Sequence, residues 1–436
     1  MSAAPVISVA SGRQITDAGA LTAEAYLADR LVDPEEDYAL ELRDAERRAV
    51  EATLLVATIE RSDGEPVVVG TVTLAPYGTS YAEIAEPGEL EIRMLAVAPE
   101  VRGRGIAEDL MRAALRECVT AGARRVVLST LDAMHTAHRL YGRLGFVAHP
   151  GRDWGHEEIH LRVHTWTPPQ APGVLVELAT WPPARVEVTG AGWRVGVSAG
   201  VTRRANSAVP LAAGSRTTGS STTGAITTGS IATGSIAAGA ANVSSAIDEV
   251  EAVYAAAGLP SIVRVGLGDA AVEAELAARG YVVASDTDVL VRELSDAPEP
   301  RRPHLHVGVA PAPDRAWLGL WLGAKKADAD ADLARQILVG APADYLTAVV
   351  DGRAVGVIRV AYAEDWAALS CLVVLPDSRR GGLGRELTLR ALAVARANGA
   401  RRAFLQVESH NVAAARLYGN LGFQPADAYR YRELPL

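Results

Sequence analysis

The chain has 436 residues, of which 49% are hydrophobic and 22% charged, and its formal net charge at pH 7 is −9. This length predicts two or three domains, and the composition is typical of a globular protein with a buried core. The negative charge argues against a protein that coats nucleic acid or an anionic membrane, because no overall positive field attracts phosphate groups. We therefore expect neither nucleic acid nor a membrane as a partner.

The cysteines and the first residues indicate a compartment. Cys118 and Cys371 are the two cysteines, too few for a disulfide framework or a cysteine-rich zinc module. No apolar run reaches the roughly 18 residues of a membrane span. The opening residues MSAAPVISVASGRQ lack the basic and apolar segments of a secretory signal. The histidines show no metal-ligand spacing. These features predict a cytoplasmic protein without a bound metal.

Residues 1–166 form the first predicted domain, in which strands and helices alternate. An apolar strand at Ile92–Val97 is followed by a turn at 102–107 and by a helix with apolar residues at helical spacing. Gly122 ends this helix as a C-cap. A strand at Arg125–Ser129 follows, and then a second helix that closes with Leu-Tyr-Gly-x-Leu-Gly-Phe. This order predicts a mixed α/β fold.

Residues 170–296 form the second predicted domain, between a proline-rich run at 168–172 and the segment APEPRRP at 297–303. Within it, residues 214–241 consist almost wholly of Gly, Ser, Thr, Ala and Ile. Such a stretch cannot bury enough apolar area to offset its ordering entropy, so it predicts a flexible insertion. The rest of this domain resembles a worn version of the first, but nothing in it matches the glycine-rich turn.

Residues 304–436 form the third predicted domain, which repeats the first. Residues 372–423 align with residues 95–146 at a constant offset of 277 without a gap, and 21 of the 52 positions are identical. The strand Leu369–Val374, the glycine-rich turn and the closing Leu-Tyr-Gly-x-Leu-Gly-Phe recur in the same order. Two copies of one strand–turn–helix–strand–helix unit therefore stand near the two ends of the chain.

The glycine-rich turn is the most informative feature of both copies. Glycines allow successive backbone amides to converge, and the start of the following helix adds the positive end of its dipole, so the turn suits a phosphate or pyrophosphate. The alternative is a tight turn with solvated arginines. The turn occurs twice between a strand and a helix, and this recurrence favours the anion site. The turn is not a Walker loop, because no Gly-Lys-Ser/Thr follows. It is not a Rossmann fingerprint either, since the third glycine and the downstream acid are missing.

The pattern Arg-x-x-Gly-x-Gly/Ala before a helix resembles the pyrophosphate-binding motif of the GCN5-related N-acetyltransferase (GNAT) superfamily. The segments AHRLYGRLGF and NVAAARLYGNLGF resemble the second signature of that superfamily. The resemblance implies an α/β fold with a mixed sheet, in which two complete GNAT domains flank a degenerate GNAT-like segment. In the middle segment, Trp193-Arg194 and the run Thr-Arg-Arg-Ala-Asn-Ser at 202–207 resemble a bacterial GNAT group that carries such a segment before the catalytic domain.

The resemblance implies acetyl-CoA as the donor. In this superfamily the strand before the turn opens away from its neighbour and pairs with the pantetheine arm, while the turn amides hold the pyrophosphate. Asn411 matches an asparagine often found near that arm, where the first copy departs from the pattern with Met134. The donor-binding residues implied by position are Leu95, Val97, Arg102, Gly103, Arg104, Gly105, Ile106 and Ala107 in the first copy and Leu372, Val374, Arg379, Arg380, Gly381, Gly382, Leu383, Gly384 and Asn411 in the second.

The resemblance also implies an acid in each copy. Tyr141 and Tyr418 match the tyrosine that commonly protonates the leaving thiolate of CoA. A thiolate leaving group gains from a positioned acid. The alternative for each is a tyrosine that only packs its helix.

A general base would take the proton from the incoming ammonium before attack on the thioester. Glu91, on the strand that leads into the turn, stands where many relatives carry a carboxylate, and a solvated strand residue is its alternative. The constant offset puts Ala368 at the equivalent place, so the second copy lacks this base. Its weaker substitutes are Asp365, Glu364, Glu408 and a water chain.

Two functions remain open at this point. The first is an enzyme, an acetyl-CoA-dependent N-acetyltransferase that acetylates a primary amine of a small molecule, an amino acid or a protein. The second is that one of the two units is a non-catalytic acetyl-CoA-binding sensor or scaffold, which the missing carboxylate at Ala368 motivates. The shared motifs bind the donor, whereas variable loops build the acceptor pocket, so the motifs do not identify the amine.

Overall fold

The computed structural model describes residues 5–33, 35, 37–61, 64–156, 159–211, 240–266, 268–302, 304–325 and 330–435. The predicted insertion at 214–241 lies outside the described residues, apart from the start of a helix at Ala240. The chain divides into two compact units, Met1–Pro168 and Pro169–Leu436. Both are mixed α/β structures, as the sequence predicts. None of the described helices has both the length and the apolar content needed to cross a membrane.

The first unit is built on one sheet with the strand order β1-β2-β3-β4-β5-β8-β6, and β7 pairs with β8. Only β4 and β5 are paired in parallel among its described strands. In chain order the elements are β1 (Val6–Val9), α1 (Arg13–Ala28), α2 (Asp37–Arg43), α3 (Ala45–Glu51), β2 (Thr53–Glu60), β3 (Pro66–Pro76), β4 (Glu89–Val97), η1 (Pro99–Val101), α4 (Ile106–Thr120), β5 (Arg125–Leu131), α5 (His135–Arg143), β6 (Val147–Ala148), η2 (Pro150–Arg152), β7 (Trp154–His156) and β8 (Ile159–Trp166).

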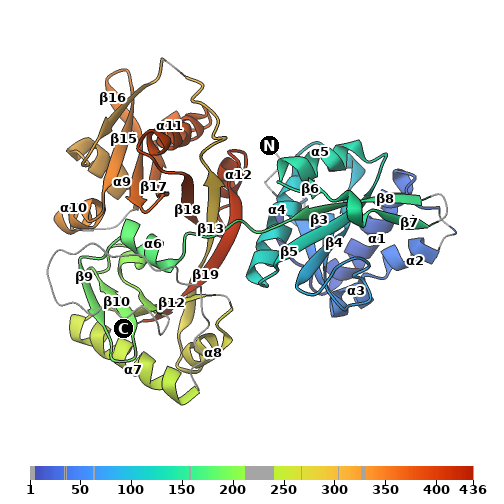
Figure 1. The fold of residues 1–436 in the computed structure, drawn as a ribbon, viewed down its shortest axis with the longest axis horizontal. Coiled ribbons are helices and arrows are strands. Elements are labelled where there is room, and N and C mark those ends of the chain that lie inside the picture. The colour runs from blue at the N-terminus through green and yellow to red at the C-terminus, as the bar shows by residue number, and fades with distance from the viewer. Residues whose placement is uncertain are drawn as a thin grey trace. The chain divides into compact units, whose positions relative to one another are not determined.

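Helices cover both faces of this sheet (Figure 1). Helix α4 has apolar residues three and four positions apart, so that one stripe, including Leu110 and Ala114, packs with Leu90 and Ile92 of β4. Residues of α1 and α2 pack on the opposite face in a separate cluster with Met94. Because side chains alternate along a strand, β4 presents Glu91 to the face opposite α4.

The second unit is built on a single larger sheet with the order β14-β15-β16-β17-β18-β13-β19-β12-β11-β10-β9. Its elements are α6 (Val174–Thr180), β9 (Arg185–Val188), β10 (Trp193–Val197), η3 (Arg203–Ala205), β11 (Ala208–Pro210), α7 (Ala240–Ala257), β12 (Ser261–Gly266), α8 (Ala270–Ala278), β13 (Val282–Glu293), β14 (His306–Ala310), α9 (Arg315–Lys325), α10 (Ala331–Val339), β15 (Ala343–Val350), β16 (Arg353–Ala363), β17 (Trp366–Val374), η4 (Pro376–Ser378), α11 (Leu383–Ala397), β18 (Arg402–Glu408), α12 (Val412–Gly419) and β19 (Gln424–Leu434).

The second and third predicted domains share this sheet. Strand β13 comes from the predicted middle domain, yet it lies between β18 and β19, which both belong to the C-terminal third (Figure 1). The boundary predicted between residues 296 and 304 therefore falls between strands of one sheet, and it stays a prediction.

The helices of the second unit divide over the two faces of its sheet. Helix α11 packs with Ala367 and Leu369 of β17 on one face. Val176 of α6 packs with Trp366 and Ala368 on the other. Helices α7 and α8 cover the part of the sheet that contains β10 and β12. The face opposite α11 thus corresponds to the face of the first unit that carries Glu91.

A bulge interrupts β4 and β17 at equivalent positions. The register shifts where Met94 and Cys371 lie, and both residues adopt positive φ, at 55° and 59°. The extra residue exchanges the two faces of the strand, because Leu369 packs with α11 before the bulge while Leu372 and Val374 do so after it. After each bulge, the side chains that were on one face of the strand continue on the other face up to the glycine-rich turn.

Candidate active site

The glycine-rich turns leave backbone amides free at the start of a helix. In the first unit Gly105 precedes α4 with φ of 83°, and in the second Gly382 precedes α11 with φ of 78°. An added Cβ at Gly103 or Gly105 meets no atom within 4 Å. In the described part of the chain, no acceptor is found for the amides of residues 103–105 or 380–382. The first amides of α4 and α11 also lack intrahelical partners, so both turns can accept an anion.

The first arginine of each turn holds the turn against its own strand. Arg102 Nε donates to the carbonyl oxygen of Val97 at 3.1 Å, and Arg379 Nε donates to that of Val374 at 2.9 Å. Arg104 lies exposed on the first turn. Arg380 has φ of 63° where the first unit has Gly103. In the second unit Arg302 donates to the carbonyl oxygen of Gly381 and adds a positive charge that the sequence pattern did not indicate.

The strand before each turn loses its neighbour at the bulge. Strand β4 pairs with β5 only from Glu89 to Glu91, although it continues to Val97. Strand β17 pairs with β18 only from Trp366 to Leu369 and continues to Val374. In the described residues no strand pairs with this edge of residues 95–97 or 372–374. A linear ligand with amide groups could therefore pair with each edge as an added strand.

Turn, strand and tyrosine helix meet in the second unit. An added Cβ at Gly384 would lie 3.8 Å from a side-chain carbon of Val374, 3.9 Å from one of Leu372 and 3.8 Å from one of Leu417. Tyr418 follows Leu417 on α12, and its ring packs against Phe423 with 5.8 Å between ring centroids.

The first residues of α4 and α11 anchor the helix starts. Ile106, Ala107 and Leu383 lie in the first turns of α4 and α11 and pack their side chains into the cores.

Both tyrosines hold their protons. Tyr141 on α5 is buried, and burial raises the pKa of its phenol to about 12. Burial also raises the pKa of Tyr418, and the nearby Cys371 thiol raises it further. At neutral pH each phenol is protonated, which an acid for a leaving thiolate requires.

Glu91 is a buried residue rather than a solvated strand carboxylate. Its side chain is 1% exposed. Its Oε2 accepts hydrogen bonds from the amides of Ile84 and Ala85, at 2.8 and 3.2 Å, while its Oε1 has no hydrogen-bond partner in the described structure. Burial is the largest influence on its pKa, which is raised. Oε1 lies 4.0 Å from Arg93 Nε, beyond hydrogen-bond distance. A carboxylate whose pKa is raised by burial accepts a proton more readily than a solvated one.

The substitutes for Glu91 in the second unit are occupied or solvated. Asp365 forms a bidentate ion pair with Arg402, which holds the pKa of Asp365 below its usual range. Glu364 lies exposed in the turn between β16 and β17. Glu408 is half exposed beside His410. Ala368 itself is buried. Asn411 caps α12, since its Oδ1 accepts from the amide of Ala414 at 3.1 Å.

Family comparisons match both units. A model described as "Probable histone acetyltransferase Rv0428c C-terminal" matches residues 177–432, which is more than half of the chain. The chain belongs to this family. A second model, "Acetyltransferase (GNAT) family", matches residues 21–146. The protein therefore belongs to the GNAT superfamily.

Individual relatives are more distant. The "Uncharacterized N-acetyltransferase YobR" of Bacillus subtilis is 38% identical over 73 residues, and the match covers 17% of this chain and 30% of that relative. A GCN5-related N-acetyltransferase from Kribbella flavida has 20% identity and a TM-score of 0.37 over 45% of this chain and 77% of its own. The acetyltransferase yncA from Salmonella typhimurium, solved with its cofactor acetyl-CoA, has 18% identity and a TM-score of 0.30 over 38% of this chain and 94% of its own.

Sequence reasoning missed the polar residues that surround Glu91 in this acetyltransferase. Arg93 is nearly buried and contacts Glu83 at 2.7 Å, Glu91 at 4.0 Å and the phenol of Tyr38 at 3.4 Å. Tyr26 of α1 interacts electrostatically with Tyr38, Arg93 and Tyr141. The alternation along β4 could have revealed Arg93, since residues two apart share a face. Nothing local in α1 or α2 indicates that Tyr26 and Tyr38 lie near Arg93.

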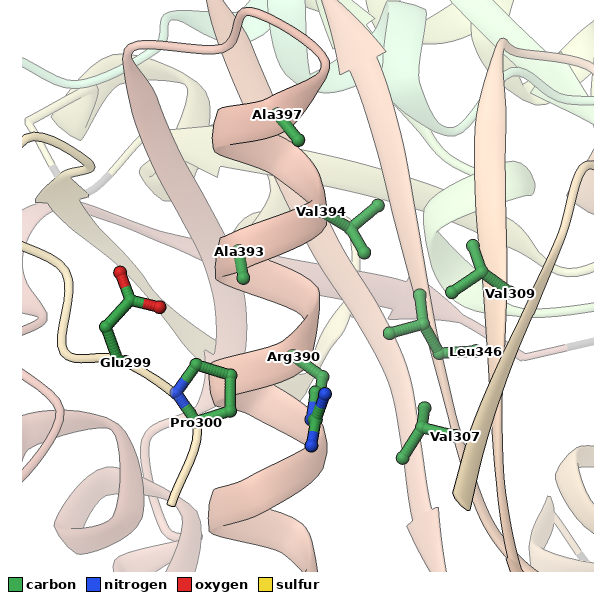
Figure 2. Close-up of a pocket in the computed structure, with 9 residues that line it drawn as sticks. All are labelled: Glu299, Pro300, Val307, Val309, Leu346, Arg390, Ala393, Val394 and Ala397. Carbon is green, nitrogen blue, oxygen red and sulfur yellow. The ribbon is translucent and has the colours of Figure 1, made fainter. Parts of the chain in front are cut away.

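One hollow of the described structure lies away from these groups. It has a volume of about 550 Å³ and lies between α11 and the strands β14 and β15 (Figure 2). Arg390 and Glu299 stand at its edge, and valines and alanines line most of the rest. No residue of the glycine-rich turn, of the open edge of β17 or of α12 lines it. No group of three His, Cys, Asp or Glu side chains suited to a metal is found among the described residues.

Proposed function

We propose that both units bind acetyl-CoA and transfer its acetyl group to a primary amine. The observation that carries the proposal is the open strand edge beside a turn with free amides, which occurs in both units. The turn and helix N-terminus suit a pyrophosphate. The strand edge suits an arm with amide groups, because such an arm can continue the sheet.

The residues of the first unit divide the proton transfers between them. Bound acetyl-CoA would supply an activated acetyl thioester. Glu91 would take a proton from the ammonium of the acceptor at Oε1, which has no hydrogen bond, while its Oε2 stays on the amides of Ile84 and Ala85. Tyr141 would donate the proton that the departing sulfur needs, and its raised pKa keeps that proton available. Each transfer is worth roughly 10²–10⁴ in rate.

The acceptor is a primary amine whose surroundings the two units build differently. In the first unit Tyr26, Tyr38, Glu83 and Arg93 lie on the face that carries Glu91. The family description names a histone acetyltransferase, so lysine side chains of peptides belong among the acceptors to be tested.

Titration calorimetry of the full chain with acetyl-CoA tests the donor. We expect two sites per chain, and a chain without any site would contradict the proposal. Release of CoA thiol, measured with a panel of amino acids, polyamines, aminosugars and lysine peptides, tests the transfer. A unit that only senses acetyl-CoA would bind it, and the loss of that unit's tyrosine would leave turnover unchanged.

A further inference from the structure

A second buried carboxylate lies in the second unit, on a residue outside the repeat. Glu177 of α6 has a side chain that is 1% exposed. Its Oε2 accepts hydrogen bonds from Arg264 Nη2 at 2.8 Å and from Gln406 Nε2. Its Oε1 is buried and has no hydrogen-bond partner in the described structure. A buried polar atom without a partner is costly, and a catalytic role is one explanation for it.

The hydrogen-bond pattern of Glu177 is the pattern of Glu91. In both residues two donors hold Oε2, and Oε1 is buried without a hydrogen-bond partner. Arg93 Nε lies 4.0 Å from Oε1 of Glu91. The donors differ, because backbone amides serve Glu91 while a guanidinium and a carboxamide serve Glu177. In both cases burial is the largest influence and raises the pKa of the carboxyl group.

Glu177 also lies on the corresponding face of the sheet. Ala368, the counterpart of Glu91, pairs with Phe404 of β18 and packs in one cluster with Val176 of α6. Gln406 follows two residues after Phe404 on the same face and is the first position after the paired stretch of β17 and β18 that shares this face. The bond to Gln406 therefore places the Glu177 carboxylate where the two strands part.

We propose that Glu177 is the general base of a second acetyl-transfer site and replaces the carboxylate that Ala368 cannot supply. The inference rests on the proposed function, because it assigns a residue to that same reaction in the second unit. Oε1 of Glu177 would accept a proton from the ammonium group of a primary amine. A helix from the start of the second unit would thus complete a site whose donor motifs come from its end.

The charged groups that face Glu177 come from three elements, β12, β19 and η3. Arg264 of β12 is the ion-pair partner and stacks on the ring of Tyr429 of β19, 3.7 Å from its centroid. Asp427 of β19 raises the pKa of Glu177, and Arg204 of η3 lowers it. Two guanidinium groups thus stand against two carboxyl groups. The two arginines favour the ionised carboxylate, which can accept a proton. Burial acts in the opposite direction and raises the pKa of Glu177, so the carboxylate is a stronger base than a solvated one.

The reaction balances with the groups present. Oε1 of Glu177 takes one proton from the ammonium, and the neutral nitrogen then forms a bond to the thioester carbonyl carbon. The carbon–sulfur bond breaks with its electron pair on sulfur, and Tyr418 gives sulfur a proton. The nitrogen sheds its second proton, which restores Tyr418, and Glu177 returns its proton to solvent. The products are an acetylated amine, CoA thiol and one proton.

The test uses the full chain with the first site weakened by Glu91→Gln and Tyr141→Phe. In this background the remaining turnover, measured as CoA thiol release with the amine that the panel identifies, belongs to the second unit. Adding Glu177→Gln is expected to lower kcat by a factor of about 10²–10⁴ at pH 7. A lysine-type amine has a pKa of about 10.4, so its neutral fraction in solution rises about tenfold per pH unit below that value. The neutral amine needs no base, so the defect should shrink about tenfold per pH unit.

A matched control and a second variant separate catalysis from folding. Glu273→Gln removes a half-exposed carboxylate of α8 that pairs with Arg430 and Arg432, is not among the groups that face Glu177, and should leave kcat within a few-fold. Glu177→Gln with Arg264→Gln removes both charges of the ion pair, so that no buried guanidinium is left alone, and should show the same pH-dependent loss. Acetyl-CoA binding should persist in every variant.

The outcomes distinguish the two proposals. Turnover that Tyr418→Phe abolishes but Glu177→Gln leaves intact overturns the role of Glu177 and keeps the proposed function. A loss in Glu177→Gln that stays constant from pH 7 to pH 10 points to a structural effect and also overturns that role. A parent chain that transfers acetyl to no amine of the panel overturns the proposed function and the role of Glu177 with it.

Discussion

Met94 and Cys371 lie 277 residues apart and share a left-handed backbone conformation, at φ of 55° and 59°. Neither side chain is one that favours positive φ. Both residues lie at a bulge, and the pairing of β4 with β5 and of β17 with β18 ends two to three residues before it. The open edge beside each glycine-rich turn is thus a backbone feature that survives a change of side chain from methionine to cysteine.

The turns can be tested by adding a negative charge. Gly105→Glu should abolish acetyl-CoA binding in the first unit alone, and Gly382→Glu in the second alone, because the carboxylate would occupy the place of the pyrophosphate. The space around a Cβ at Gly105 is open, so the cost to folding comes from φ, about 1–2 kcal/mol. Titration calorimetry should show one site in place of two. Gly105→Ala carries the same backbone strain without the charge and should keep both sites.

The tyrosines can be tested one by one in the full chain. Tyr141→Phe or Tyr418→Phe should slow one unit by roughly 10²–10⁴, and the double variant should slow total CoA thiol release by that factor. Burial raises the pKa of Tyr141 to about 12, so the phenol keeps its proton and should cause no fall in rate between pH 7 and pH 10. Full turnover in the double variant would show that both tyrosines only pack their helices.

Glu91 should make stability depend on pH in a defined direction. Burial raises its pKa in the folded state above the value near 4.3 of an unfolded chain. The folded protein then binds the proton more tightly, so this contribution to stability is full below that unfolded value and is lost as pH rises through the raised pKa. Compared with the parent, Glu91→Gln should therefore gain in melting temperature from pH 4 to pH 7. A difference that is constant over this range would contradict the raised pKa.

Arg380 stands where the first unit has Gly103, and both adopt positive φ, at 63° and 75°. An arginine in this conformation is strained, whereas glycine is not, although glycine loses more entropy on folding. Arg380→Gly should therefore stabilise the protein by about 0.5–1 kcal/mol. The reverse change, Gly103→Arg, should destabilise it. Melting temperatures of the two variants check both signs, and a lower melting temperature for Arg380→Gly would contradict the argument.

The local chemistry of the donor site could be predicted from the sequence, because it depends on residues close together in the chain. Glycines at Gly105 and Gly382 permit positive φ, and the helices that follow offer their amides whatever else surrounds them. The offset of 277 showed that the pattern occurs twice. Alternation along β4 also fixed the face on which Glu91 lies.

Burial and long-range partners were decided by the tertiary structure. Whether Glu91 is solvated depends on the loop at Ile84 and Ala85 closing over it, and no local pattern encodes that approach. Glu177 meets Gln406 across 229 residues, and it does so only because α6 packs on the face of the sheet that carries Ala368. Sequence spacing by itself determined where the two turns proposed to bind an anion lie. Packing of distant segments decided which carboxylates lose water and keep a free oxygen, because desolvation is a property of the assembled core.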